Sequence, residues 1–401
     1  MTFASTPAAE PILELIRSQI RPALPALERC RSTRQLLDHP VYRDIHPALE
    51  RVLKTAQAGC YRSGDAPARE KYRFLAWNIE RGIHLDRQIA ELRTHPYLSA
   101  CDVLLITETD IGMARSKNRA VAGEMAEALG MDYCFVPSYI SLVKGSGLEN
   151  QAEGDNEYGL HGDAILSRHP MHNVRVIPLE NGIDKFAARE KRLGSPTVIA
   201  ADIDLPGMPV TAASIHLDAH STQHHRFEQM RTVVDALVTD RPVVLGGDWN
   251  TTTYDSSGAL PAILGFWRRV LMGVGHVMEN HYLHPYRYFE RELFDLLEGR
   301  GYDWRNANVP AEHTLCYDVS DPRAHNSLLE WVPPWCFPFI RWSLREHNGR
   351  CPLKLDWFAV RGLAMDSPRV LHEFREGRDV PLSDHDPIGI ELRARDIMTH
   401  G

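Results

Sequence analysis

The 401-residue sequence has no long hydrophobic run. Nothing in it reaches the ~18 consecutive apolar residues that a transmembrane helix requires. The first residues, MTFASTPAAEPILELIR, have neither the basic region nor the continuous apolar region of a secretory signal. We therefore expect neither a membrane span nor secretion, and we predict a cytoplasmic protein.

Cysteine is scarce and irregularly placed. The seven cysteines are far apart and none forms a C-x-x-C pair. An odd number with wide spacing argues against a disulfide framework and against a cysteine-based zinc site. We expect reduced and mostly buried thiols, in keeping with a reducing compartment.

The sequence also has no excess of positive charge. Lysine and arginine total 45 against 53 acidic residues, which gives a formal charge of −8. Proteins that grip long nucleic acids do so through clustered lysine and arginine, so this class is disfavoured. Contact with a small or local phosphate remains open. The composition, 43% apolar and 24% charged, is that of an ordinary globular protein with a sizeable core.

The chain divides into an N-terminal segment and a longer body. Within residues 1–70, apolar residues recur at helical spacing, which predicts an N-terminal helical extension. Residues 71–395 hold short aliphatic runs separated by helix patterns such as 119–129 and 224–238, which indicates an α/β layered fold. The runs that we predict to be strands are 74–79, 102–107, 164–167, 197–203, 210–216, 243–247, 354–360 and 388–392.

Residues 251–355 contain 16 of the 33 aromatic residues. A connection this long must have its own structure or act as a lid. It could consist of helices that pack on the body through aromatic side chains, or of a cap that shapes the substrate pocket. The stretch 331–342, WVPPWCFPFIRW, could also contact a membrane interface or a partner.

Unusual polar residues follow the predicted strands at six places in the chain. One such residue alone is commonly a turn or a cap, but six clusters of carboxylate, amide and imidazole indicate a shared site. Hard oxygen ligands without cysteine suit Mg²⁺ or Mn²⁺. Such an ion neutralises a phosphoester, while carboxylates and histidines supply the base and the charge stabilisation that hydrolysis needs.

The motifs WNIERG, ITETD, HGDAILSR, SIHLD, GGDWN, KLDWF and SDHDP occur in this order. In this set and order the sequence resembles the endonuclease/exonuclease/phosphatase superfamily (the DNase I-like group) over about residues 72–393. The resemblance implies a four-layer α/β sandwich of two mixed β-sheets flanked by helices, with the site at one end. It also implies a divalent-metal-dependent phosphoester hydrolase, a phosphodiesterase or phosphatase.

The resemblance assigns three residues to metal binding. Glu108 matches the family's metal-binding glutamate, and Asn78 matches the asparagine that helps to hold metal and phosphate. Asp384 fits a metal or second-metal position. The expected cofactor is Mg²⁺ or Mn²⁺.

Five further residues match catalytic positions of the family. Asp248 matches the aspartate that activates or aligns the attacking water, and Asn250 matches the asparagine that steadies this carboxylate. His385 matches the histidine that stabilises the phosphoryl charge, and Asp356 the aspartate that orients it. His216 matches a histidine that contacts phosphate or assists the leaving group.

The substrate is less constrained than the chemistry. Arg115 and Asn118 closely follow the metal-binding glutamate, so either could contact a second phosphate or head group, or belong to a solvated loop. The charge and the aromatic segment favour a phosphorylated small molecule or a phospholipid head group, with peripheral membrane contact possible. A nuclease acting on DNA or RNA is the alternative, and an inactive binding module of the same fold is a further one.

Overall fold

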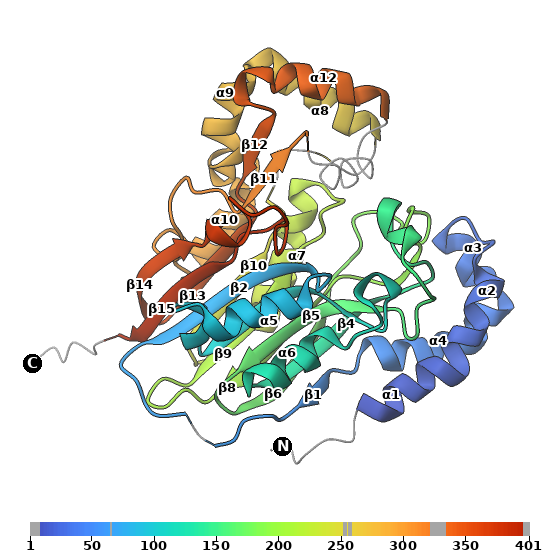
Figure 1. The fold of residues 1–401 in the computed structure, drawn as a ribbon, viewed down its shortest axis with the longest axis horizontal. Coiled ribbons are helices and arrows are strands. Elements are labelled where there is room, and N and C mark those ends of the chain that lie inside the picture. Colours follow the sequence, from blue (N-terminus) through green and yellow to red (C-terminus); the bar gives the residue numbers. More distant parts are fainter. Residues whose placement is uncertain (1–8, 65, 252–254, 256–258, 321–333, 396–401) are drawn as a thin grey trace, which may run out of the picture.

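The computed structural model describes residues 9–64, 66–251, 255, 259–320 and 334–395 (Figure 1). The first of two facing sheets has the order β1-β4-β5-β3-β2-β15-β14, with β7 paired to β4. It is mixed, because β2 and β3 run parallel and the other neighbours antiparallel. Its strands are β1 (Gln57–Gly59), β2 (Tyr72–Arg81), β3 (Val103–Ile111), β4 (Asp132–Ser141), β5 (Leu160–Ser167), β7 (Arg192–Gly194), β14 (Leu363–Val370) and β15 (Ile388–Ala394).

The second sheet has the order β13-β10-β9-β8-β6. It is mixed too, because β9 and β10 run parallel while the remaining pairs are antiparallel. Its strands are β6 (Met171–Pro178), β8 (Thr197–Ile203), β9 (Val210–His216), β10 (Val243–Asp248) and β13 (Asp356–Arg361). The central strands of both sheets are among those predicted from their apolar runs.

Strands in the middle of the sandwich are buried on both faces. In β2, Phe74 and Ala76 belong to the core between the sheets, whereas Leu75 and Trp77 belong to the core beneath the outer helices. Successive side chains of a strand point to opposite faces, so a strand covered on both sides is apolar throughout. This burial explains why the sequence shows continuous apolar runs rather than alternation.

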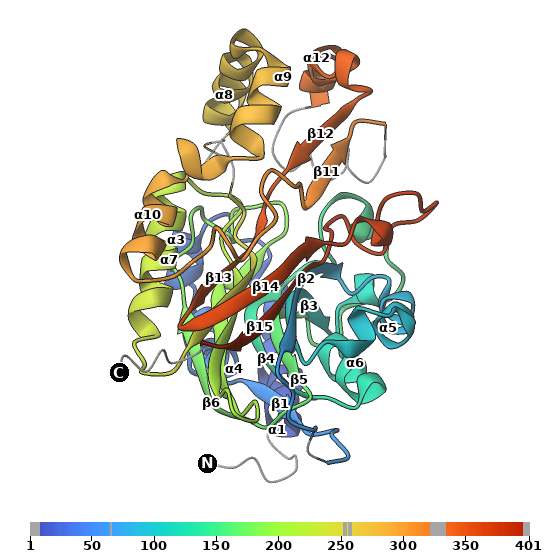
Figure 2. The same ribbon diagram turned by 90° about the vertical axis from the view of Figure 1, so that its left-hand side faces the viewer.

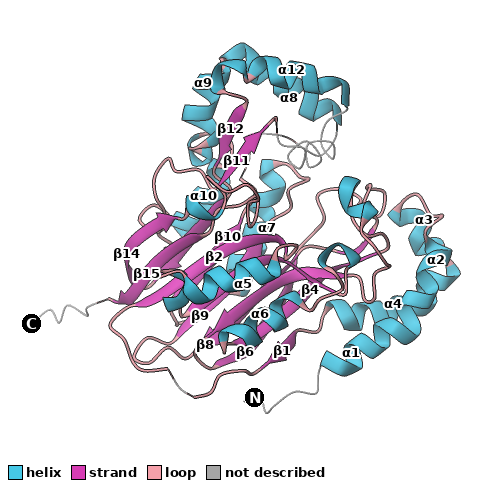
Figure 3. Cartoon of the chain, in the orientation of Figure 1, coloured by secondary structure: helices cyan, strands magenta, loops and turns pink. Residues whose placement is uncertain are grey.

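Helices cover the outer faces of both sheets (Figures 1 and 3). Helices α5 (Leu85–Thr94) and α6 (Val121–Leu129) pack on the first sheet, and α7 (Gln223–Ala236) and α10 (Arg291–Gly299) pack on the second. The layers are therefore helix, sheet, sheet, helix, and the predicted four-layer α/β sandwich is confirmed. None of the helices in the described ranges is both long and apolar enough to cross a bilayer.

The N-terminal segment is helical and lies against the first sheet. Ile16, Ile20, Leu27 and Val52 are fully buried in the same core as residues of β4 and β5. The backbone N–H and the hydroxyl of Thr33 also donate to the carboxylate of Asp184 in the body. The helices are α1 (Ala9–Leu15), α2 (Leu24–Leu27), α3 (Thr33–Asp38) and α4 (Pro40–Leu53), with a π-helical turn at Ile16–Ile20 and a 3₁₀ turn at Arg21–Ala23.

The aromatic-rich segment divides into two parts. One part, which includes α10 and Trp304, packs on the second sheet with its aromatic side chains in that core. The other part projects beyond the strand ends (Figure 2), and we call it the cap. The described cap contains α8 (Ala259–Met272), α9 (Val274–Val277), the hairpin β11 (Leu315–Asp318) and β12 (Arg350–Leu353), and α12 (Phe337–Ser343). Trp331, in the stretch singled out above, lies outside the described residues.

Candidate active site

Residues from both sheets meet where four strands end beneath the cap. Asp248 is the last residue of β10, and its direct cross-strand neighbours are His216 of β9 and Asp356 of β13. Asn78 and Glu108 lie near the ends of the parallel pair β2 and β3. Parallel strands bring their carboxyl ends to one edge of a sheet, which explains why residues so far apart in sequence converge here.

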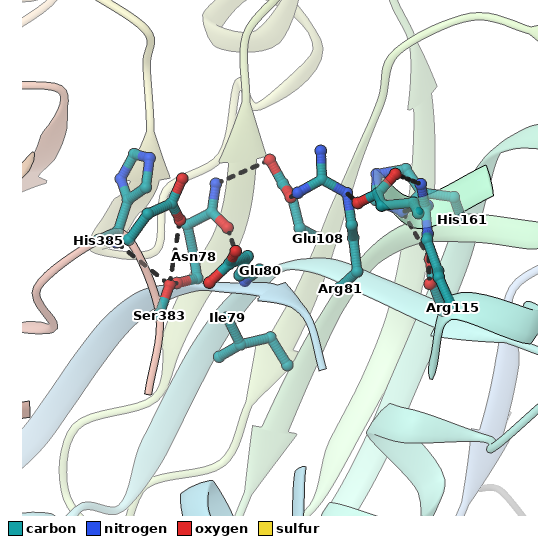
Figure 4. Close-up of polar contacts among 12 residues, drawn as sticks. Asn78, Ile79, Glu80, Arg81, Glu108, Arg115, His161, Ser383 and His385 are labelled. Atoms are coloured by element: carbon teal, nitrogen blue, oxygen red, sulfur yellow. Dashed lines mark hydrogen bonds and ion pairs between the residues drawn. The ribbon is translucent and has the colours of Figure 1, made fainter. Parts of the chain in front are cut away.

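The side chain of Asn78 bridges the two sheets. Its Nδ2 donates to Glu108 Oε1 at 3.0 Å and to Asp248 Oδ2 at 3.2 Å. Its Oδ1 accepts the backbone N–H of Glu80 at 3.1 Å (Figure 4). One buried amide thus holds two carboxylates, one from each sheet, close together.

Glu108 lies at a β-bulge, where the register of β3 shifts against both neighbours. Its φ is 56°, a conformation that costs energy for a residue other than glycine and is often found at functional sites. The backbone N–H donates to Asp163 Oδ1 at 3.1 Å, which holds the bulge in place. Burial raises the pKa of Glu108, but the charges of Arg81 and His216 outweigh it and keep the pKa well below its usual value.

His385 and Asp356 form a buried pair. His385 Nδ1 lies 2.8 Å from Asp356 Oδ2, and its Nε2 lies 3.7 Å from Asp248 Oδ2. Burial lowers the pKa of His385, yet the charges of Asp356 and Asp248 outweigh this and raise the pKa well above its usual value. The imidazole is therefore held as a cation whose Nε2 faces the site.

Asp248 is buried, and burial raises its pKa to about 6. Its Oδ1 accepts the backbone N–H of Asn250 at 2.9 Å. The Asn250 side chain donates in turn to the carbonyl of Leu217 at 3.0 Å, and its backbone has a positive φ of 50°. Asn250 therefore fixes the turn after β10 and, through it, the orientation of the Asp248 carboxylate.

His216 lies between the carboxylates without bonding to any of them. Its Nε2 is 3.9 Å from Glu108 Oε1 and 3.7 Å from Asp248 Oδ2, and its Nδ1 is 3.9 Å from Asp163 Oδ1. These separations exceed a hydrogen bond. The imidazole is thus within electrostatic reach of three carboxylates and also lines the cavity beneath the cap.

A short loop carries Asp384 to the rim of the site. The hydroxyl of Ser383 donates to the carbonyl of Asn78 at 2.6 Å and accepts the backbone N–H of His385 at 3.2 Å. These two bonds tie the loop to β2. Asp384 lines the same cavity as His385, so this loop brings both residues to the site.

Arg115 and Asn118 are not brought into this cavity. The Arg115 side chain is 1% exposed, and it forms ion pairs with Asp110 at 2.8 Å, Glu149 at 3.1 Å and Glu190 at 3.2 Å. Asn118 bonds to backbone groups of the loop at 155–157. The sequence left open a substrate contact or a solvated loop for these residues. Arg115 is instead enclosed by carboxylates, and Asn118 holds the loop at 155–157.

Three other residues at the site were not predicted from sequence. Asp163 is fully buried behind His216 and Glu108, and burial raises its pKa to about 7. Arg81 pairs with Glu108, its Nη1 lying 3.3 Å from Oε2. Lys185 lines the cavity, and its Nζ lies 2.6 Å from Asp218 Oδ1. Asp163 had a detectable signal, a lone carboxylate within the apolar strand HGDAILS, whereas nothing local marked the other two.

The donor set fits a hard divalent cation. Glu108 Oε2 is buried and faces Arg81 Nη1 at 3.3 Å without forming a hydrogen bond, and a second carboxylate, from Asp248, shares the Asn78 amide. Carboxylate oxygens of this kind suit Mg²⁺ or Mn²⁺. The Asn78 amide presents nitrogen to both carboxylates, so it would have to turn to offer oxygen to an ion. His385 is unsuited as a ligand, because a protonated imidazole has no free lone pair.

A cavity of ≈ 380 Å³ connects the site to the cap. Its floor is polar and comes from the sandwich, with residues that include His216, Asp248 and His385. Its roof comes from the cap and is mostly apolar, although the buried Arg269 also lines it. The roof residues include Ile263, Phe266, Trp267, Val270, Phe339 and Ile340.

A sequence model of the Endonuclease/Exonuclease/phosphatase family matches residues 75–385. The match spans most of the chain and contains every catalytic and metal position discussed above. The chain belongs to this family, whose members are metal-dependent phosphoester hydrolases. No curated protein matches the sequence detectably.

Solved structures of the same family are similar in fold. An endonuclease/exonuclease/phosphatase from Beutenbergia cavernae is 17% identical with a TM-score of 0.49, over 81% of this chain and 72% of that one. An AP endonuclease from Archaeoglobus fulgidus is 14% identical with a TM-score of 0.45, over 80% and 98%. The human Nocturnin catalytic domain is 13% identical with a TM-score of 0.42, over 85% and 97%. Similarities this distant do not identify a substrate.

Proposed function

We propose that this chain is a phosphoester hydrolase that depends on Mg²⁺ or Mn²⁺, with Asp248 activating the attacking water. The observation that carries the proposal is the convergence of Glu108, Asp248 and His385 on one hollow, linked by the Asn78 amide. Glu108 and Asn78 are the proposed metal ligands, and Asp384 at the rim is a further candidate. The ion would neutralise phosphoryl charge and stabilise the leaving oxygen.

Asp248 suits the role of general base. Burial raises its pKa to about 6, so the carboxylate is largely ionised at neutral pH and can still accept a proton from water. Asn250 fixes its orientation. A carboxylate held in this way would deprotonate the water as it attacks phosphorus.

Two imidazoles suit the stabilisation of the phosphoryl oxygens. His385 is kept cationic by Asp356 and directs Nε2 into the cavity floor, where negative charge grows during attack. His216 faces the same volume from β9 and is placed to contact a phosphoryl oxygen or the leaving group. This arrangement suits the phosphoryl group of a phosphodiester and that of a phosphomonoester equally.

The test is a hydrolysis screen of the full chain with Mg²⁺ or Mn²⁺. The panel contains an aryl phosphodiester, an aryl phosphomonoester, a phospholipid, RNA, and single-stranded and duplex DNA. Metal-dependent turnover of at least one phosphoester is expected. Asp248→Asn should lower kcat by about 10²- to 10⁴-fold, because it removes the base, and His385→Ala should also lower it.

The controls separate an enzyme from an inactive relative of the same fold. Circular dichroism and urea unfolding should show that both variants remain folded, and EDTA should abolish turnover by the parent chain. If no phosphoester is hydrolysed, or if Asp248→Asn hydrolyses as fast as the parent, the catalytic assignment is wrong. The binding-module alternative would then stand.

A further inference from the structure

We propose that the cap seats this protein on a lipid surface and receives the apolar chain of a phospholipid whose phosphoester lies on the catalytic floor. The inference rests on the proposed hydrolase function, and it specifies the substrate as an amphiphile. Two separate observations carry it: an apolar roof over the active site and an exposed apolar face on the outside of the same helices.

Helix α8 is apolar on both of its faces. Its inner face contributes Ile263, Phe266 and Val270 to the roof of the cavity. Its outer face has Leu264 at 62% and Leu271 at 86% exposed. Apart from Arg268 and Arg269 the helix has no charged residue, and an outer face with this much exposed leucine is normally covered by protein or by lipid.

The outer face forms a continuous stripe. Leu260, Leu264, Trp267 and Leu271 follow one another at intervals of four, three and four residues, which places them on one side of the helix. All four are exposed among the residues that the structure describes. Large exposed apolar patches mark interaction surfaces.

Aromatic side chains join this stripe to the mouth of the cavity. The ring of Trp267 lies 5.4 Å from that of Phe339 on α12, and Phe339 lies 6.5 Å from Trp335. All three line the cavity and are also at least one-third exposed. Trp342, half exposed, extends the face along α12. An apolar group that enters between these rings passes from the outer face directly to the roof.

The charge of the cap helices fits a lipid surface. Residues 259–277 and 334–345 contain four arginines and no acidic residue, within a chain of net charge −8. Arg268 on α8 and Arg341 on α12 are exposed, whereas Arg345 pairs with Glu346 at 3.0 Å. Arginine next to exposed leucine and tryptophan is typical of protein faces that lie in a membrane interface and meet anionic head groups.

The aliphatic part of the face favours lipid over nucleic acid. Aromatic rings and arginine can stack on unpaired bases. Leu260, Leu264 and Leu271 can neither stack on bases nor form hydrogen bonds, and they are the most exposed apolar residues of α8. Insertion among acyl chains removes this apolar area from water, whereas binding to a nucleic acid strand would leave much of it hydrated.

The first experiment measures binding of the full chain to vesicles by sedimentation. We expect binding to phosphatidylcholine vesicles that contain phosphatidylglycerol, weaker binding to phosphatidylcholine alone, and loss of that difference at high salt. Leu264→Asp with Leu271→Asp should weaken binding by at least about tenfold. Val238→Asp is the matched control, because Val238 is an 80% exposed apolar residue near the start of β10, at the opposite end of that strand from Asp248.

A second variant changes charge alone. Arg268→Glu with Arg341→Glu should remove the preference for phosphatidylglycerol while the protein stays folded by circular dichroism. The proposal is overturned if the parent chain does not bind vesicles, or if the leucine double variant binds them as the parent does. It is also overturned if the leucine double variant loses binding to a single-stranded oligonucleotide instead, or if the face proves to join two copies of the chain in solution.

The second experiment compares hydrolysis of phospholipid in vesicles with hydrolysis of a soluble aryl phosphodiester. The ratio of the two rates should fall in the leucine double variant and remain parental in Val238→Asp. A chain that hydrolyses the aryl phosphodiester but no vesicle lipid keeps the proposed function and overturns this inference. A chain that hydrolyses neither contradicts the proposed function, while vesicle binding still tests the cap surface separately.

Discussion

At the scale of single residues, Arg115 supports the active site from beneath. Its guanidinium contacts Glu149, and the other oxygen of Glu149 lies 3.0 Å from Arg81 Nε. Arg81 in turn pairs with Glu108. Arg115 therefore sets the position of the proposed metal ligand through two intervening side chains, a role that no sequence spacing indicated.

Replacing Arg115 tests this supporting role. Arg115→Ala would remove one of the cations beside Glu190, which keeps Arg192, and would leave Asp110 with His161 alone. We expect it to lower the free energy of unfolding by about 1–3 kcal/mol. Urea denaturation measures this loss. Arg189→Ala, at an exposed arginine, is the control and should change stability little. If Arg115→Ala is as stable as the parent and only its KM is raised, Arg115 contacts the substrate, which is one of the two roles that the sequence left open.

At the scale of elements, a histidine joins the catalytic loop to its neighbours. His372, in the short 3₁₀ turn His372–Phe374, bonds through Nδ1 to Asp386 and through Nε2 to Glu312, both at 2.7 Å. Asp386 follows the proposed catalytic His385 directly and also pairs with Arg375. These contacts anchor the end of the loop at 382–386, which Ser383 also ties to β2.

This anchor makes stability depend on pH. The hydrogen bond to Asp386, aided by Glu312, raises the pKa of His372 to about 9 from 6.5. Because the pKa of His372 is higher in the folded state than in the unfolded state, the charged imidazole stabilises the fold fully below pH 6.5. This stabilisation is lost as the pH rises from 6.5 to about 9. The free energy of unfolding should fall by about 1–2 kcal/mol across this window. The fall is this small because His372 is partly exposed and solvent screens its charge.

The matched variant isolates the contribution of His372. His372→Gln should remove most of that fall when urea unfolding is measured at both ends of the window. His224→Gln is the control, because His224 is mostly exposed and its partner Glu292 is exposed too. An unchanged pH dependence in His372→Gln would show that other groups cause it.

At the scale of the whole molecule, the N-terminal helices act as part of the core. Ile16 and Ile20 are fully buried in the cluster that also contains Ile140 and Leu160 of the first sheet. The Lys191 side chain donates to the carbonyl of Cys30 at 2.7 Å, which holds the extension to the body. The extension therefore acts as a brace on the sandwich.

A single substitution measures how much the brace contributes. Ile20→Ala should lower the free energy of unfolding of the full chain by about 2–5 kcal/mol, because it leaves a cavity in a closed core. Leu37→Ala is the control, since Leu37 is 51% exposed on the same extension. Equal stabilities for the two variants would mean that the extension folds separately from the sandwich.

The sequence predicted most interior strands and the edge strand β13, but among the strands that it missed are the interior strand β4 and the edge strand β6. The runs 197–203 and 210–216 coincide with β8 and β9, because these strands are buried on both faces and therefore apolar throughout. Strand β6 was missed. It lies at the edge of its sheet and is mostly half-buried, with polar residues such as His172 and Arg175 that break any apolar run.

The sequence by itself determined the family and the four-layer sandwich, and it predicted residues that line the cavity floor. The motifs that carry these predictions are short and lie at strand ends. Only the tertiary structure decided which way each arginine faces, that Asp163 stands behind His216, and that the cap is apolar inside and outside. These features depend on contacts between segments far apart in the chain. A local pattern of polarity does not identify the partner that a side chain contacts in the folded protein.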